Sequence, residues 1–175
     1  STTAVLYASG TGSSNYSSVF IYPTVDNLSI SGNLITPLVY LNGADNVTID
    51  GRAATTNLTI VNTYYDGNMP TLGQATTITF ENDATYNQVK YSNINGSAGW
   101  TSQAYSSNLT GIIFFGTTSG TGNDNNLISY NNITTANDTY RPKMAIYSNG
   151  SGTTGSENSN NTISNNNIYN FLHRN

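Results

Sequence analysis

Hydrophobic residues along this chain come in short runs of three or four, separated by stretches rich in Gly, Asn and Ser, and helical periodicity is almost absent. Such runs are typical of β-strands between turns. The runs recur in pairs. The first strand of each pair is predicted at residues 19–22, 38–41, 77–80, 112–115 and 145–147, and the second at residues 28–30, 47–49, 89–91, 127–129 and 162–164.

The first strand recurs after about 19, 39, 35 and 33 residues, so the repeat is loosely spaced. Repeats of strands and polar turns favour stacked coils, in which each unit buries its apolar face on its neighbours. A third strand is visible only in places, best at residues 58–61, and the looser segments 95–109 and 134–143 occupy its place elsewhere. We therefore expect one all-β domain over residues 1–175, with a strand or cap at 1–18 and about five coils at 19–170.

Asparagine recurs just before or near the second strand of each pair, at Asn27, Asn46, Asn87, Asn126 and Asn161. Equivalent positions in neighbouring coils lie about 4.8 Å apart. Asn tolerates a left-handed backbone and can bond either its own neighbours or the Asn of the next coil. The spacing therefore predicts a ladder of asparagine side chains.

Two segments, Pro37–Gly51 and Asn160–Asn170, resemble the repeats of right-handed parallel β-helices. Their sequence pattern is similar to that of large secreted or surface-anchored proteins of the Bacteroidetes group, which are commonly exported by the type IX secretion route. The resemblance covers roughly residues 19–170. It implies a right-handed parallel β-helix and an extracellular location, without implying a reaction. Because neither a signal peptide nor a sorting domain is visible, we expect a fragment of a longer chain.

The composition narrows the functions that this chain can have. Charged residues make up 8% of it, whereas Asn, Ser and Thr number 28, 20 and 26. A net charge of −4 with five unclustered basic residues argues against a nucleic-acid surface. No stretch approaches the roughly 18 apolar residues that a membrane span requires. The absence of cysteine excludes disulfides and thiolate metal sites, and we expect no cofactor.

Catalysis by a β-helix requires clustered carboxylates, commonly with a basic partner. The closest approach to such a cluster is Asp45 and Asp50, at opposite ends of one short strand and near Arg52. If stacking brings Asp26 one coil below Asp45, these three acids are weak candidates for calcium ligands. The favoured interpretation is that they are turn-forming residues that cap strands. The single histidine, His173, lies close to the end of the chain, and we predict no catalytic residue.

Aromatic side chains in loops are the ligand-binding candidates, because their rings can stack on sugar faces. They are Tyr64, Tyr65 and Trp100, with Tyr105 and Tyr140 nearby in sequence, whereas strand aromatics such as Phe114 are expected to fill the core. The alternative is that these loops fold back and cover the flank of the helix.

These observations favour a non-enzymatic structural or adhesive module of a secreted or cell-surface protein, which presents loops to a surface, a glycan or a protein partner. One alternative is the substrate-binding part of a carbohydrate-active β-helix enzyme whose catalytic residues lie elsewhere; another is a self-assembling fibre subunit. The expected partners are further coils or domains of the same polypeptide, or a neighbouring chain at the open C-terminal coil, and glycans.

Overall fold

The computed structural model describes residues 1–52, 58–65, 73–98, 110–117 and 120–172. Within these residues the chain forms fifteen β-strands, arranged as three parallel sheets of five strands each. In the described part of the chain there is no helix of the length and hydrophobicity that crossing a membrane requires.

The chain visits the three sheets in turn, so that each strand from β4 to β12 pairs with the strand three elements before it and the strand three elements after it. Sheet A contains β1 (Ala4–Tyr7), β4 (Val39–Asn42), β7 (Ile78–Glu81), β10 (Ile113–Phe115) and β13 (Ile146–Ser148). Sheet B contains β2 (Val19–Ile21), β5 (Val47–Asp50), β8 (Gln88–Lys90), β11 (Leu127–Ser129) and β14 (Thr162–Ser164). Sheet C contains β3 (Ser29–Gly32), β6 (Leu58–Asn62), β9 (Ser92–Gly96), β12 (Asn132–Thr135) and β15 (Asn167–Ile168).

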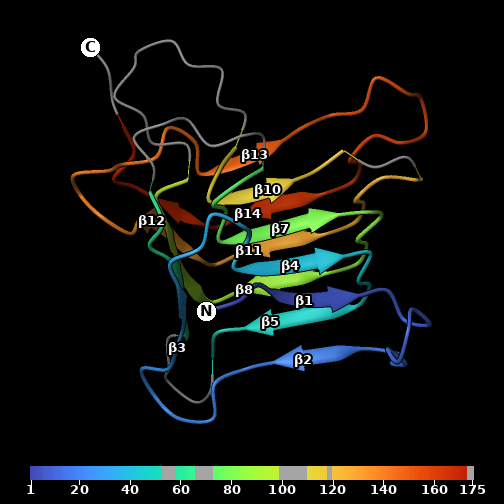
Figure 1. Ribbon diagram of the computed structural model, residues 1–175, viewed down its shortest axis with the longest axis horizontal. Helices are drawn as coiled ribbons and strands as arrows, with labels where there is room; N and C mark the ends of the chain where they lie inside the picture. The colour runs from blue at the N-terminus through green and yellow to red at the C-terminus, as the bar shows by residue number, and fades with distance from the viewer. Residues whose placement is uncertain (53–57, 66–72, 99–109, 118–119, 173–175) are drawn as a thin grey trace.

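This topology is a parallel β-helix, as the strand repeat predicts. In Figure 1 the strands of sheets A and B run across the molecule in opposite directions, and sheet C closes its left-hand side. One strand from each sheet makes a rung, from rung 1 (β1–β3) to rung 5 (β13–β15). From rung 1 to rung 5 the chain makes about four turns around the axis of the β-helix, slightly fewer than the five coils expected.

The core consists of side chains that point inward at equivalent positions of successive rungs. In sheet C the register places five isoleucines in one column: Ile30, Ile60, Ile94, Ile133 and Ile168. In sheet A, Phe80 and Phe115 stack with ring centroids 4.6 Å apart. Both rings are fully buried, as are Ile60, Ile94 and Ile133. Each inward side chain is therefore covered by its counterparts above and below, which a single coil cannot achieve alone.

Sharp corners separate the sheets, and residues in the left-handed conformation recur at them. Between sheets A and B, φ is between 55° and 59° at Asn46, Tyr86, Asn125 and Asn160. Between sheets B and C, φ is between 54° and 61° at Asn27, Tyr91, Tyr130 and Asn165. Asn visits this conformation at low cost, which explains why it fills five of these eight positions.

Buried asparagines next to these corners form three ladders. The backbone N–H of Asn87 donates to Oδ1 of Asn126 at 2.9 Å, and the N–H of Asn126 donates to Oδ1 of Asn161 at 2.9 Å. The Nδ2 group of Asn126 donates to the carbonyl of Ala84 at 2.9 Å and to Oδ1 of Asn161 at 3.1 Å. The same pattern joins two further pairs, Asn123 with Asn158 and Asn131 with Asn166.

The predicted ladder is present, but its membership differs from the expectation. Asn87, Asn126 and Asn161 belong to it, whereas Asn27 and Asn46 occupy left-handed corner positions instead. In rung 2 the ladder position is Val47, whose N–H donates to Oδ1 of Asn87 at 2.9 Å. Asparagine therefore has two roles, as a left-handed corner residue and as a member of a ladder. The two positions are adjacent in the chain, so sequence spacing alone does not distinguish them.

The phase of the first repeat also differs from the expectation. Residues 19–22 and 28–30 were expected as the first and second strands of a pair, yet β2 pairs with β5 in sheet B and β3 pairs with β6 in sheet C. The sheet A strand of that rung is β1, within the segment expected as a strand or cap. A third strand follows in every rung rather than in places, since β9 and β12 continue sheet C.

The isoleucine column predicts a graded cost for removing its side chains. Ile94→Ala should lower the free energy of unfolding by about 2–5 kcal/mol, because the cavity lies in the middle of the column. Ile168→Ala, at a position that is 47% exposed at the end of the same column, should cost below about 1 kcal/mol. Urea unfolding measures both, and equal costs would contradict a core built from stacked equivalents.

The ladders predict that two chemically identical substitutions differ in effect. Asn126→Ala removes the acceptor of the buried N–H of Asn87, and should cost about 3 kcal/mol because a buried donor is left unsatisfied. Asn132→Ala removes an exposed Asn that bonds Asn93 on the surface, and should cost about 0.5 kcal/mol or less. Thermal or urea unfolding of the pair checks this, and comparable losses would contradict the structural role of the ladder.

Candidate functional site

The outer face of sheet A carries a column of larger side chains. Because strand residues alternate between faces, Tyr40 points outward between the buried Val39 and Leu41. The strand register places Tyr40 opposite Thr79, which in turn lies opposite Phe114, and Phe114 lies opposite Tyr147. Neighbouring members of the column are therefore about 4.8 Å apart along the axis of the β-helix.

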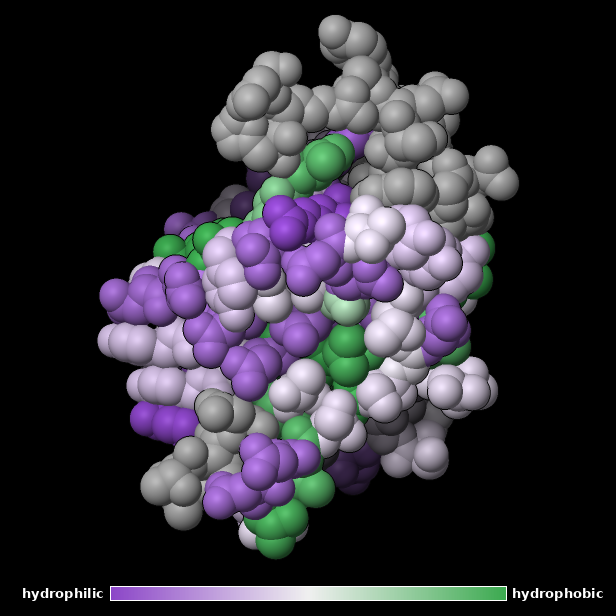
Figure 2. All heavy atoms as spheres, turned by 90° about the vertical axis from the view of Figure 1, so that its left-hand side faces the viewer, coloured by the Kyte–Doolittle hydropathy of each residue, from purple (hydrophilic) through white to green (hydrophobic). Residues whose placement is uncertain are grey.

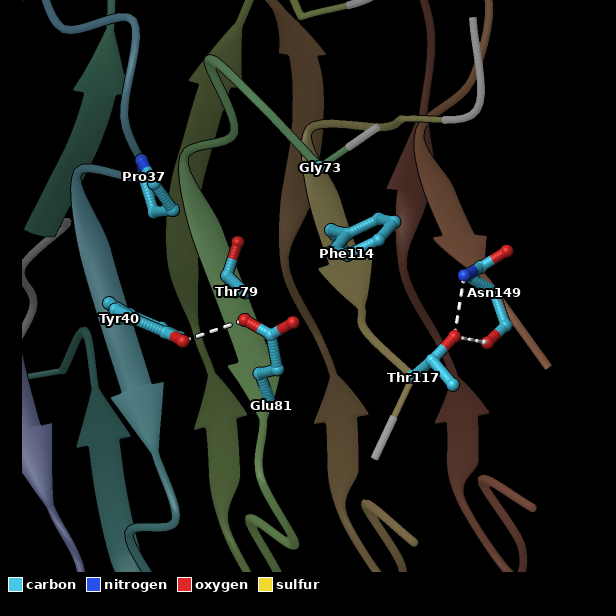
Figure 3. A pocket seen from close by; sticks show the side chains of 8 residues that line it. All are labelled: Pro37, Tyr40, Gly73, Thr79, Glu81, Phe114, Thr117 and Asn149. Carbon is cyan, nitrogen blue, oxygen red and sulfur yellow. Dashed lines mark hydrogen bonds between the residues drawn. The ribbon is translucent and has the colours of Figure 1, made fainter. Parts of the chain in front are cut away.

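A groove of about 230 Å³ lies on this face. Figure 3 shows that residues of β4, β7 and β10 line it together with residues of the flanking turns. Its lining combines aromatic rings, hydroxyl groups, an amide and one carboxylate, from Pro37, Tyr40, Gly73, Thr79, Glu81, Phe114, Thr117 and Asn149.

At one end of the groove, a short hydrogen bond joins Tyr40 and Glu81. The Tyr40 hydroxyl donates to Oε2 of Glu81 at 2.6 Å. Burial raises the pKa of Tyr40, and the hydrogen bond to Glu81 and the negative charge of Glu81 raise that pKa further. Gly116 leaves room for this carboxylate, because a Cβ at that position would lie 2.9 Å from Glu81 Cγ and Oε1. The groove therefore contains a carboxylate held by a neutral phenol.

The other end of the groove is formed by Thr117 and Asn149. The Asn149 side-chain amide donates to Thr117 Oγ1 at 2.6 Å, and Thr117 Oγ1 donates to the Asn149 carbonyl at 3.0 Å. The Asn149 N–H donates to the carbonyl of Phe115 at 2.9 Å, which fixes this turn on sheet A. These bonds hold an amide and a hydroxyl in place beside the cavity (Figure 3).

Phe114 lies in the wall of the groove rather than in the core, contrary to the expectation that strand aromatics fill the interior. Its neighbours Ile113 and Phe115 point inward, so alternation turns Phe114 outward. The ring is nevertheless 3% exposed. Gly73 crosses closely over it, since a Cβ there would lie 2.8 Å from Phe114 Cε1, and Tyr147 stacks beside it with centroids 6.0 Å apart.

The chemistry of this groove suits the binding of a small polar ligand. Among the described residues, its lining offers ring faces, hydroxyl and amide groups and a single carboxylate, without a basic side chain. Glycoside hydrolysis commonly uses two carboxyl groups about 5–10 Å apart. The lining residues supply one, and Tyr40 occupies one of its oxygens.

The three acids expected from the sequence do not come together. Asp45 lies before β5 and Asp26 lies after β2, and these two strands pair in register, so the acids lie beyond opposite ends of the pair. Asp45 Oδ1 accepts hydrogen bonds from the N–H and hydroxyl of Thr85, at 2.8 and 2.7 Å. The expected stacking of Asp26 below Asp45 is therefore wrong. Within the described residues no group of three potential metal ligands is present.

Asp50 lies at the end of β5 in a small charged cluster. Its carboxylate lies 3.4 Å from Nε of Arg52 and 3.7 Å from Nζ of Lys90. The Arg52 guanidinium lies 3.2 Å from the centroid of the Tyr91 ring, which stacks on Tyr130 with centroids 5.0 Å apart. These side chains thus form a stack at the corner between sheets B and C.

The structure describes two of the three loop aromatics that the sequence indicates as ligand-binding candidates, Tyr64 and Tyr65. Tyr65 is 45% exposed and stacks on Tyr140, with ring centroids 3.6 Å apart. The hydrogen bond that Tyr140 makes to Tyr65 and the electrostatic interaction between the two groups raise the pKa of Tyr140. Tyr64 is half-buried, and its N–H donates to Asn62 Oδ1 at 3.3 Å. Trp100 and His173 lie outside the described residues.

The groove residues on sheet A were not singled out from the sequence. A usable signal exists in the alternation of β4, where Tyr40 is the one outward position between two aliphatic residues. Glu81, at the end of β7, lies 41 residues after Tyr40 in the chain and becomes its neighbour only through the register of β4 with β7. That register depends on the length of the intervening turns, which hydrophobic patterns leave open.

The raised pKa of Tyr40 predicts a change in alkaline stability. The folded state keeps the Tyr40 phenol protonated above its usual pKa of about 10. Its stabilising contribution is therefore complete below about pH 10 and is lost as the pH rises toward the higher folded-state pKa. Tyr40→Phe should flatten the decline of unfolding free energy above pH 10. Urea titrations from pH 8 to 11 provide the measurement, and a decline in Tyr40→Phe as steep as in the unmodified protein would contradict the assignment.

Comparison of the chain with protein-family models, with curated proteins and with solved structures finds no match. The geometry of the groove and of the ladders is therefore the basis for the functional conclusions below.

Proposed function

We propose that this protein is a non-enzymatic β-helix module of a secreted or cell-surface protein, and that it binds a neutral glycan in the groove on sheet A. The observation that carries the proposal is the composition of the groove. Tyr40 offers a ring, while Thr117, Asn149 and Glu81 offer hydroxyl, amide and carboxylate groups for sugar hydroxyls. Recognition sites for small polar ligands combine apolar walls with a few fixed polar groups in this way.

The charge of the groove favours a neutral glycan over an acidic one. Glu81 is the charged residue of its lining, and the whole chain carries a net charge of −4. A uronic-acid polymer would bring carboxylates toward Glu81, and the described part of the lining holds no lysine or arginine to pair with them. Like charges disfavour such a complex. A neutral sugar can instead donate hydroxyl hydrogens to the Glu81 carboxylate.

The described residues of the lining include one acid, Glu81, rather than a pair, which favours binding without catalysis. Asp45 and Asp50, the acids weighed for catalysis from the sequence, have structural partners in Thr85 and in Arg52 and Lys90. The extracellular assignment comes from the low charge content and from the resemblance to large secreted proteins of the Bacteroidetes group. In such a protein the β-helix forms a stiff rod that holds the groove at a fixed distance from its neighbours.

Variants of the groove test this proposal. Tyr40→Ala should weaken binding to neutral oligosaccharides about three- to tenfold, because a ring contact contributes about 0.5–1.5 kcal/mol. Glu81→Gln should weaken binding as well, since it removes a charged acceptor. Tyr130→Ala, an exposed tyrosine at a different corner, is the matched control and should bind normally. A glycan array followed by titration calorimetry provides the measurement.

Two outcomes would overturn the proposal. Folded protein that binds no neutral glycan would remove the binding function. Release of sugar products that Glu81→Gln abolishes would replace binding with catalysis and would favour the carbohydrate-active alternative.

A further inference from the structure

Tyrosine is the side chain through which this protein can form a covalent link between rungs. The chain has 13 tyrosines and no cysteine, so a disulfide is excluded. A tyrosine phenol can lose an electron and a proton to an oxidant, and the radical that results carries unpaired spin on the Cε atoms beside the oxygen. Two such radicals couple through a carbon–carbon bond when their rings already lie close together.

Tyr65 and Tyr140 meet this requirement. Their ring centroids lie 3.6 Å apart and their ring planes make an angle of 13°, which is closer than the separation of about 4.5–7 Å that is typical of aromatic pairs. A hydrogen bond between the two phenol groups raises the pKa of Tyr140. Because the hydroxyl groups are neighbours and the rings are nearly parallel, the Cε atoms that flank the two hydroxyl groups also face each other.

The pair is open to a reagent in solution. Tyr65 is 45% exposed and Tyr140 is partly exposed. Both follow strands of sheet C, which closes the left-hand side of the molecule in Figure 1. Figure 2 faces this side, and hydrophilic or weakly polar residues make up most of its coloured surface. An oxidant carried in water can therefore reach these rings without unfolding of the β-helix.

The other stacked pairs of the described residues that contain tyrosine are less suited to coupling. Tyr91 and Tyr130 stack with centroids 5.0 Å apart, and the Arg52 guanidinium also lies over the Tyr91 ring, 3.2 Å from its centroid. Phe114 and Tyr147 are 6.0 Å apart and offer a single phenol. Ring separation therefore predicts an order of reactivity among these pairs.

Tyr65 and Tyr140 belong to rungs that are not adjacent. Tyr65 follows β6 of rung 2, and Tyr140 follows β12 of rung 4. The backbone N–H of Tyr140 donates to the carbonyl of Asn137 at 3.0 Å, in a turn that positions the ring. The two tyrosines are about 75 residues apart in the chain. A covalent link between positions so distant would strongly restrict the unfolded chain, which stabilises the folded state.

We propose that Tyr65 and Tyr140 form a dityrosine cross-link, an oxidative staple that fastens rung 2 to rung 4. The oxidant is hydrogen peroxide, used by a haem peroxidase. Each phenol gives up one electron and one proton, the two radicals form a Cε–Cε bond, and the hydrogen on each of those carbons moves to the phenol oxygen and restores the hydroxyl group. The two electrons and two protons reduce one molecule of hydrogen peroxide to two molecules of water.

Treatment of the dilute, folded protein with a peroxidase and limiting hydrogen peroxide tests this assignment. The monomer should lose the mass of two hydrogen atoms and gain the fluorescence of dityrosine, and peptide mapping should place the link between Tyr65 and Tyr140. Tyr65→Phe and Tyr140→Phe keep both rings but remove one phenol, so each should abolish the link. Tyr130→Phe is the matched control, since it removes a phenol from the looser stack, and it should form the link as the unmodified protein does.

The stapling role has a separate readout. Cross-linked protein should unfold at a temperature about 5 °C or more above that of the untreated protein. The same treatment should leave the unfolding temperature of Tyr65→Phe unchanged. Circular dichroism before treatment confirms that each variant folds.

Several results would overturn the proposal. They are folded protein that forms no dityrosine, a link that persists in Tyr65→Phe, and a link between Tyr91 and Tyr130 in equal or higher yield. Covalent dimers in place of a link within the monomer would assign the reactive tyrosines to contacts between molecules, and would contradict it too. Cross-linked protein with an unchanged unfolding temperature would remove the stapling role.

Discussion

The structure depends on one constraint, namely that every rung must satisfy its corner backbone groups through the rung above or below it. A β-helix turns sharply between sheets, and at the corners the backbone leaves the regular ladder of strand hydrogen bonds. Buried N–H groups without partners are costly. In rungs 3 to 5 the side-chain amides of Asn87, Asn126 and Asn161 meet this requirement, with two parallel ladders beside them. The high asparagine content follows from this geometry.

Much of the architecture could be predicted from the sequence, because stacking imposes the same pattern on each rung. The strands around Ile49, Val89 and Ile128 are recognisable as equivalents, and they do form one column of sheet B. The first rung was placed out of phase because its turns differ in length from the others. The strand from Ser92 to Gly96 was missed because its outward residues are polar, which leaves Ile94 as its single aliphatic signal.

The candidate site was harder to predict, since it arises on the outer face, where stacking places few restrictions. Tyr40 and Glu81 come from adjacent strands of sheet A, and only the three-dimensional register makes them partners. The sequence indicates loop tyrosines as binding candidates, whereas in the structure one of them, Tyr65, stacks on the ring of Tyr140. The inward columns thus define the rod, whereas the outward columns are open to vary and to acquire a binding surface.

The most direct test of the central constraint is native-state hydrogen exchange at the corner N–H groups that donate to ladder amides, those of Asn87, Asn126 and Asn131. If these bonds join the rungs into one cooperative structure, the three N–H groups should exchange only through global or near-global unfolding, as slowly as core strand amides such as that of Ile94. Exchange as fast as that of the exposed turn around Thr153 would contradict the account.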